Sequence, residues 1–127
     1  MRFSSLHIIG FTFCCLIIAG CQSSSPSRSA NARATQDEQI NQLASLVAAG
    51  KYLRTQCNRS DLPDDNTLMR GALRQGEKKG WDVSGFQMLP PLSDTLYEGL
   101  LKDGTPKDQQ CSAFNLSVSP FLSAIRG

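Results

Sequence analysis

The sequence predicts an all-α domain built from four short helices, and three observations support this fold class. Apolar residues recur at helical spacing in four segments, and no segment shows the alternation typical of a strand. Capping residues, prolines and glycines stand where these helices would start and stop. The chain has 127 residues, of which 40% are hydrophobic, a size that suits one domain with a modest core.

The first helix is predicted to start at a capping box over residues 35–38. There the hydroxyl of Thr35 and the carboxylate of Glu38 would each satisfy an unpaired backbone amide. Apolar positions follow at spacings of three and four as far as Leu53. We expect this helix to end near Cys57 or Asn58.

The second helix is predicted over about residues 64–79. Pro63 and the acidic residues after it suit the first turn and the positive end of the helix dipole. Gly80 suits the left-handed position that follows a helix. Gly71 and Gly76 each cost about 1 kcal/mol inside a helix, which indicates close approach of another backbone.

Two shorter helices complete the predicted domain. Residues 81–86 form a loop whose two aromatic side chains, Trp81 and Phe86, are expected to plug the core. The third helix begins at Pro90 and Pro91, with a cap at Ser93 or Asp94.

The fourth helix is predicted to start with Thr105 as its cap and Pro106 at its first helical position, after a turn at Asp103 and Gly104. Pro120 should kink or end this helix, because proline removes a backbone donor and clashes with the preceding turn.

Residues 1–20 have the parts of a secretory signal. A basic start precedes an apolar run, and that run is shorter than the roughly 20 residues that span a bilayer. The run ends in LIIAG directly before Cys21, which resembles a bacterial lipobox. The resemblance implies cleavage after Gly20, diacylation of Cys21 and a third acyl chain on the new N-terminus. Two or more chains hold a protein stably on a membrane.

The residue after the lipidated position points to the final membrane. Gln22 stands where an Asp would signal retention in the inner membrane, so the lipoprotein sorting machinery is expected to deliver the chain to the outer membrane. The alternative is an ordinary cleaved signal in which Cys14, Cys15 and Cys21 have no role. Residues 21–34 are mostly small and polar and include no large apolar side chain to bury. We therefore expect the lipidated Cys and a flexible tether over residues 21–34, followed by a helical domain over residues 35–127.

Two cysteines remain in the expected mature domain, Cys57 and Cys111. In an oxidising compartment such a pair usually becomes a disulfide, and a loop of this length gives about 4 kcal/mol of stabilisation. A redox-active or metal-bound pair is the alternative. The sequence has no Cys-x-x-Cys motif and no other soft ligands to support it.

Composition excludes most enzymatic chemistry. The single His is His7, inside the export signal, so no imidazole remains for a catalytic triad or a His-ligated metal. A net charge of +2 from 13 basic and 11 acidic residues is too balanced for a nucleic-acid binder. Asp61, Asp64 and Asp65 lack the spacing of a calcium loop, and helix capping explains them. We expect no catalytic residue, no metal and no cofactor except the covalent lipid on Cys21.

Short motifs occur in a fixed order across the predicted domain. They are Tyr52-Leu53-Arg54 with Cys57, Leu62-Pro63, Gly71-Ala72-Leu73, Gly80-Trp81-Asp82-Val83-Ser84, Tyr97 with Leu100, and Cys111. Together with the lipobox and the short tether, this set resembles the OutS/PulS family of type II secretion pilotins. The resemblance covers the export signal and roughly residues 52–121.

The resemblance implies a four-helix bundle with one disulfide, from the end of the first helix to the start of the fourth. It also implies a concave apolar groove that captures the C-terminal segment of the secretin, the outer-membrane channel subunit, as a helix. The pilotin would protect the secretin from proteolysis and bring it to the outer membrane, where the lipid anchors the pilotin facing the periplasm. Candidate groove residues are apolar positions of the first three helices, each of which suits the core at least as well: Leu43, Leu46, Val47, Leu53, Leu68, Leu73, Leu96 and Leu100.

Two other functions stay open on the sequence. A structural or inhibitory envelope lipoprotein could use the same bundle against a different protein. A hydrolase with paired carboxylates would need two acids that converge in a deep pocket, and no feature of the sequence supports one.

Overall fold

The computed structural model describes residues 28–126, with side chains from Thr35 onward. These residues form five helices and no strand: α1 (Arg28–Gln56), α2 (Asp65–Lys78), α3 (Leu89–Lys102), α4 (Lys107–Ser117) and α5 (Ser119–Arg126). The all-α prediction is confirmed. In the described part of the chain, no helix is both long enough and apolar enough to cross a bilayer.

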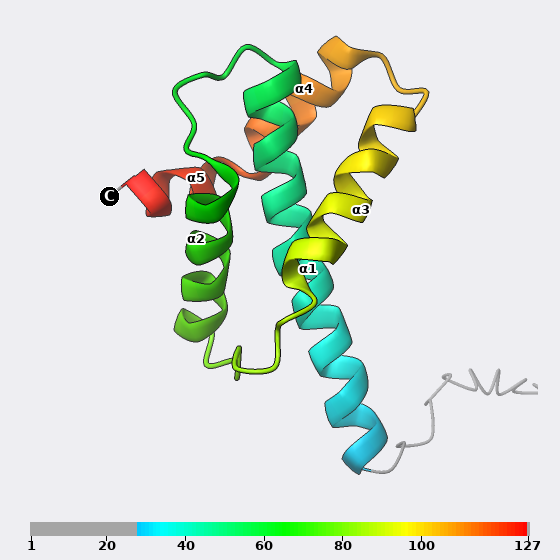
Figure 1. Cartoon of the computed structure of the whole chain (residues 1–127), viewed down its shortest axis with the longest axis vertical. Coiled ribbons are helices and arrows are strands. Elements are labelled where there is room, and N and C mark those ends of the chain that lie inside the picture. Colours follow the sequence, from blue (N-terminus) through cyan, green and yellow to red (C-terminus); the bar gives the residue numbers. More distant parts are fainter. Residues whose placement is uncertain (1–27, 127) are drawn as a thin grey trace, which may run out of the picture.

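Helix α1 is the central element of the fold. Its C-terminal half packs against α2, α3 and α4, and α5 packs against α2 (Figure 1). The N-terminal end of α1 extends beyond the other helices (Figure 1). The molecule is therefore a bundle arranged around one long helix.

The predicted start of the first helix is wrong. Helix α1 begins at Arg28 rather than at Thr35, about two turns earlier. Residues 28–34, which the sequence assigned to a flexible tether, are helical. They are rich in alanine and arginine, the residue types with the most favourable helix propensity, so the helix does not need the capping box to begin. The rest of the expected tether and the export signal, with Cys21, lie outside the described residues.

Local signals set both ends of α2. Asp64 is the N-cap, and its Oδ1 accepts a hydrogen bond of 2.9 Å from the backbone N–H of Thr67. At the other end Gly80 has φ +79°, as its predicted left-handed position requires. The N–H of Trp81 donates to the carbonyl of Gly76 at 3.0 Å, and the N–H of Gly80 donates to Glu77 at 2.9 Å. This pair of bonds is a Schellman motif, which turns the chain back onto the helix.

The remaining helix boundaries differ in detail from the predictions. Helix α3 begins at Leu89, with Pro90 inside its first turn and no side-chain cap. Ser93, a predicted cap, is buried and donates from Oγ to the carbonyl of Leu89 at 2.7 Å. Proline already holds the helical φ angle, so the first turn forms without a cap. Helix α4 has Pro106 rather than Thr105 at its N-cap.

Pro120 produces the predicted break in the last helix. Helix α4 ends at Ser117, and α5 begins at Ser119 with this proline in its first turn. The expected fourth helix is therefore divided, which is why the chain has a short fifth helix. The break lets Phe121 and Leu122 enter the core, where they are 5% and 2% exposed.

A disulfide closes the fold at the end of α1. Cys57 and Cys111 are bonded, with Cα atoms 5.7 Å apart, which confirms the expected pair. The bond fixes α4 across the C-terminal half of α1, where Tyr52 meets Phe114 edge to face with ring centroids 5.5 Å apart. The core beneath it is aliphatic, and Leu53 and Leu68 are fully buried there.

The glycines of α2 do allow close packing, but against side chains rather than a backbone. A Cβ at Gly71 would collide with the side chain of Ile125 in α5. A Cβ at Gly76 would lie 2.8 Å from Val83 Cγ1 and 3.2 Å from Leu43 Cδ1. The prediction of a close approach holds, and the identity of the neighbour was wrong.

A charged network joins α1 to the starts of α2 and α3. Asp65 accepts from Arg54 at 2.5 Å and from Lys51 at 3.1 Å, and Lys51 also reaches Asp94 at 3.4 Å. Partial burial of the Asp65 carboxylate acts to raise its pKa, but the hydrogen bonds and charges of Arg54 and Lys51 outweigh burial. The pKa of Asp65 therefore lies below its ordinary value.

This network predicts an acid-sensitive contribution to stability. A carboxyl group with a lowered folded-state pKa stabilises the fold above its unfolded pKa of about 3.9, and this is lost as pH falls through the folded pKa. Asp65→Asn should lower the free energy of unfolding at pH 7 by about 1 kcal/mol, since the pair is partly exposed. Between about pH 5 and pH 2, this variant should also lose less of its free energy of unfolding than the wild type does. Urea denaturation over this pH range measures both effects.

The matched control is Asp94→Asn, because the Asp94 side chain is 69% exposed. We expect this change to alter stability at pH 7 by about 0.5 kcal/mol or less. If the two variants have the same stability and the same acid transition, the proposed contribution of Asp65 is wrong.

Candidate partner-binding site

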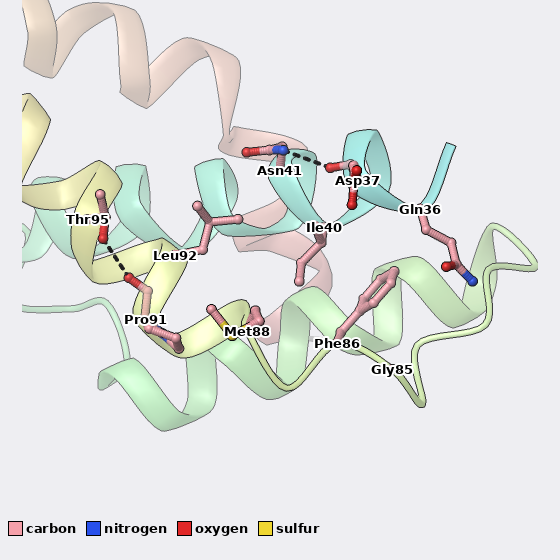
Figure 2. Close-up of a pocket in the computed structure, with 10 residues that line it drawn as sticks. All are labelled: Gln36, Asp37, Ile40, Asn41, Gly85, Phe86, Met88, Pro91, Leu92 and Thr95. Carbon is pink, nitrogen blue, oxygen red and sulfur yellow. Dashed lines mark hydrogen bonds between the residues drawn. The ribbon is translucent and has the colours of Figure 1, made fainter. Parts of the chain in front are cut away.

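Among the described residues, four cavities are lined in part by α1. The first, of about 520 Å³, lies between the N-terminal half of α1, the α2–α3 loop and the first turns of α3. Ile40 and Leu92 approach it from the two helices, with Phe86 and Met88 on the loop side (Figure 2). Met88 is 63% exposed at this site, so its side chain is available to a partner.

The other three cavities continue along α1. One of about 210 Å³ is bounded by α2 and α5, and one of about 390 Å³ lies over Gln42 and Leu46. The last, of about 220 Å³, is enclosed by Ala49 and by apolar side chains of α3 and α4. These three and the first are called the α1 cavities below.

Neighbouring α1 cavities share residues. Asn41 lines both the first cavity and the one over Leu46, and Ser45 lines that cavity and the one beside Ala49. Asp37, Asn41, Ser45 and Ala49 are four residues apart in turn, so they form one stripe on the helix surface. Three of the α1 cavities therefore follow one stripe of α1, whereas the cavity bounded by α2 and α5 touches Gln42, Leu43 and Leu46, which lie to one side of that stripe.

The α1 face is polar but uncharged over most of this length. Asn41 donates from Nδ2 to the carbonyl of Asp37 at 2.8 Å, and Ser45 donates from Oγ to the carbonyl of Asn41 at 2.8 Å. Because these two donors already have partners within α1, an apolar neighbour would not leave them unpaired. Of the described residues that line the α1 cavities, two carry a charge, Asp37 and Lys79.

An apolar wall faces this stripe from α3. Leu92, Leu96 and Leu100 are four residues apart and half-buried, and all three line α1 cavities. Phe114 of α4 closes the end of the wall beside Leu100. The arrangement is a line of apolar side chains next to a neutral polar stripe, which suits an amphipathic partner rather than a small polar substrate.

The structure separates the predicted groove residues into two groups. Leu46, Leu96 and Leu100 are half-buried and line α1 cavities. The other five lie in the core or pack against it: Leu43, Val47, Leu53 and Leu68 are at most 2% exposed, and Leu73 is half-buried against the core cluster. Of these five, Leu43 also lines the cavity bounded by α2 and α5.

Several lining residues were not among the sequence candidates. Ile40 and Phe114 showed helical apolar spacing, and Leu92 was not among the apolar positions expected for the third helix. Spacing does not tell which apolar residue remains at the surface. Phe114 reaches the site because the disulfide places α4 across α1. The predicted disulfide indicated that the fourth helix meets the end of the first, but it did not indicate which side chains of α4 line a cavity.

The acidic residues with lowered pKa values have structural partners. Hydrogen bonds lower the pKa of Asp64 through Thr67, of Asp82 through Ser84 and of Asp103 through Thr105, and each carboxylate accepts from the backbone N–H of that partner. These are caps and turns. Within the described residues, no three His, Cys, Asp or Glu side chains gather in a way that could hold a metal ion.

Comparison with known proteins gives one consistent family. Residues 18–123 match the family model for the type II secretion system pilotin lipoprotein (PulS_OutS). Pilotin OutS of Dickeya dadantii (strain 3937) is 53% identical over 130 residues, covering 99% of this chain and 98% of the relative.

Solved structures agree with this match. The chain resembles one in a pilotin/secretin peptide complex, with a TM-score of 0.70 and 62% identity over 71% of this chain and 95% of the other. It also resembles a chain in the Klebsiella pneumoniae type II secretion system outer membrane complex of PulD, PulS and the PulC HR domain. That match has a TM-score of 0.68 and 44% identity, and covers 70% of this chain and 96% of the other.

Proposed function

The chain belongs to the PulS/OutS family of type II secretion system pilotin lipoproteins, and from this we propose that it binds the C-terminal segment of a type II secretin as a helix. The binding site is the row of three α1 cavities on the stripe from Asp37 to Ala49, which acts as one groove. Binding protects the segment from proteolysis, and the lipid on Cys21 takes the complex to the outer membrane.

The observation that carries this proposal is the single stripe of α1 along which three of the α1 cavities lie. From Asp37 to Ala49 the stripe is about 18 Å long at 1.5 Å per residue, the length of about three turns of a guest helix. A guest helix presents apolar anchors at i, i+3, i+4 and i+7. The Leu92, Leu96 and Leu100 wall offers contacts at a matching spacing. A solved relative that contains a secretin peptide supports the same use of this fold.

Binding of this kind couples folding to association. Ordering a disordered segment costs several kcal/mol, so the guest has to bury a substantial apolar stripe to bind at all. The half-buried leucines of α3 and Phe114 provide apolar surface for this purpose. Once helical and docked, the guest no longer presents the extended backbone that proteases cleave, which supports the protective role.

Location follows from the expected lipid anchor. Cys21 precedes the start of α1 by only residues 22–27, so diacylation there would hold the bundle close to a membrane. Gln22 favours sorting to the outer membrane. The folded domain would then face the periplasm, where the secretin tail is exposed before the channel assembles.

Fluorescence anisotropy with a labelled peptide of the cognate secretin's C-terminal segment tests the binding site. The wild-type protein should bind at micromolar or tighter affinity, and a scrambled peptide should not bind. Leu100→Glu should weaken binding by about tenfold or more, because it places a charge in the apolar wall; a change of 1.4 kcal/mol in binding free energy is tenfold.

Leu116→Glu provides the matched control, since Leu116 is 82% exposed on α4 and lines none of the α1 cavities. It should bind the peptide as the wild type does. Circular dichroism should show a gain in helix content on mixing. Equal binding of the true and scrambled peptides would disprove the secretin assignment. An equal loss of peptide affinity in Leu100→Glu and Leu116→Glu would disprove the location of the binding site.

A further inference from the structure

Lys79 carries the positive charge of the α1 cavities. It lines two of them, the one bounded by α2 and α5 and the one over Leu46. We propose that Lys79 selects guest helices that carry an acidic side chain midway along their length. This inference rests on the proposed function, because it assumes a helix in the groove, and it adds the chemistry by which the groove chooses its guest.

The Schellman turn holds Lys79 at the groove. Lys79 is the C-cap of α2, and its backbone N–H donates to the carbonyls of Gln75 and Gly76 at 3.1 Å each. The following turn at Gly80 brings Trp81 back, and the lysine Nζ lies 4.7 Å from the Trp81 ring centroid. A cation–π contact of this kind restrains the side chain but leaves the hydrogens of the ammonium free to donate.

The ammonium of Lys79 has no acidic partner in the part of the chain that the structure describes. Among the described residues, no carboxylate forms an ion pair with Lys79, whose contact is with the Trp81 ring. The side-chain amides of Gln42 and Gln75 line the cavity bounded by α2 and α5 together with Lys79, and Gln42 also lines the one over Leu46. Neither amide hydrogen-bonds to another described residue. Three groups able to donate therefore surround one cavity, and a carboxylate is the ligand that accepts from all of them.

The position of Lys79 determines which carboxylate it meets. Of its two cavities, the one over Leu46 lies between the large cavity near Gln36 and the one beside Ala49, because it shares Asn41 with the former and Ser45 with the latter. A guest helix that fills the groove passes Lys79 with helix on both sides. A chain-terminal carboxylate would lie at an end of the guest, so the partner of Lys79 is an Asp or Glu side chain.

The surrounding charges make this contact selective. Asp37 lines the first cavity, where it disfavours acidic groups at that end of the guest. Glu77 and Lys78 are exposed but line none of the α1 cavities. Attraction for an acidic side chain is therefore confined to the middle of the groove.

Lys79→Glu and its neighbour Lys78→Glu form a matched pair, since both reverse one charge in the last turn of α2. Measured by anisotropy with the cognate secretin peptide, Lys79→Glu should weaken binding about fivefold or more, and Lys78→Glu less than about twofold. Raising the salt should weaken wild-type binding but not that of Lys79→Met. Thermal unfolding of each variant shows whether the fold is retained.

Peptide variants identify the acidic partner. Neutralising the central Asp or Glu of the guest should weaken binding to the wild type and leave binding to Lys79→Met unchanged. Replacing that acid with Lys should restore affinity to Lys79→Glu, whereas amidating the peptide C-terminus should have no effect. Equal affinity of Lys79→Glu and Lys78→Glu, or an effect of C-terminal amidation alone, overturns the inference. In both cases wild-type binding to the peptide would leave the proposed function standing.

Discussion

Replacing Cys57 and Cys111 together with serine is expected to lower the free energy of unfolding by about 4 kcal/mol. The disulfide joins positions separated by 54 residues, and a cross-link of that span removes much of the freedom of the unfolded chain. A domain of this size typically has a total stability of 5–15 kcal/mol. The loss corresponds to a fall in Tm of about 20 °C, measurable by thermal and urea denaturation followed by circular dichroism.

Reduction of the wild-type protein provides the internal control. Dithiothreitol should lower the Tm of the wild type to that of the double variant and leave the variant itself unchanged. A fall of only a few degrees would mean that the packing of α4 on α1 holds the fold without the bond. Peptide binding should decline with the fold, because Phe114 lies on the helix that the disulfide holds in place.

Cys21→Ser is expected to release the protein from the membrane completely. Attachment rests on the acyl chains that Cys21 is proposed to carry, and each buried methylene contributes about 0.8 kcal/mol. Among the described residues, no helix offers a span to replace them. Fractionation should find the variant in the soluble periplasm, and the secretin should no longer reach the outer membrane.

The same variant separates transport from binding. Because Cys21 precedes the first described helix in the sequence and is not among the described residues that line the α1 cavities, the purified variant is expected to bind the secretin peptide as tightly as the wild-type domain. Normal secretin localisation in cells that contain only Cys21→Ser would contradict the delivery role. A variant that fails to bind the peptide would show instead that the anchor affects the groove.

The features that the sequence predicted correctly depend on short-range interactions. Asp64 caps α2, Gly80 takes the left-handed position after it, and Pro120 ends α4, because each effect involves only neighbouring backbone groups. The start of α1 was missed for a related reason. The capping box at Thr35 is a valid local signal, but the preceding residues favour helix strongly enough to continue it.

The groove could be predicted only in part, because burial is decided between helices. Leu46 and Val47 are adjacent in sequence, yet Leu46 lines α1 cavities while Val47 is 2% exposed in the core. One residue is a rotation of about 100° around a helix. Which side faces the groove depends on where α3 and α4 cross α1, and helical periodicity carries no information about that.

The unbroken length of α1 limits where the protein can collect its cargo. Residues 22–27, which lie between the proposed anchor and the helix, span at most about 20 Å even when fully extended. A lipid on Cys21 would therefore keep the binding domain close to the bilayer surface. Secretin tails would have to come to the inner surface of the outer membrane to be collected, or meet the pilotin while both are still in transit.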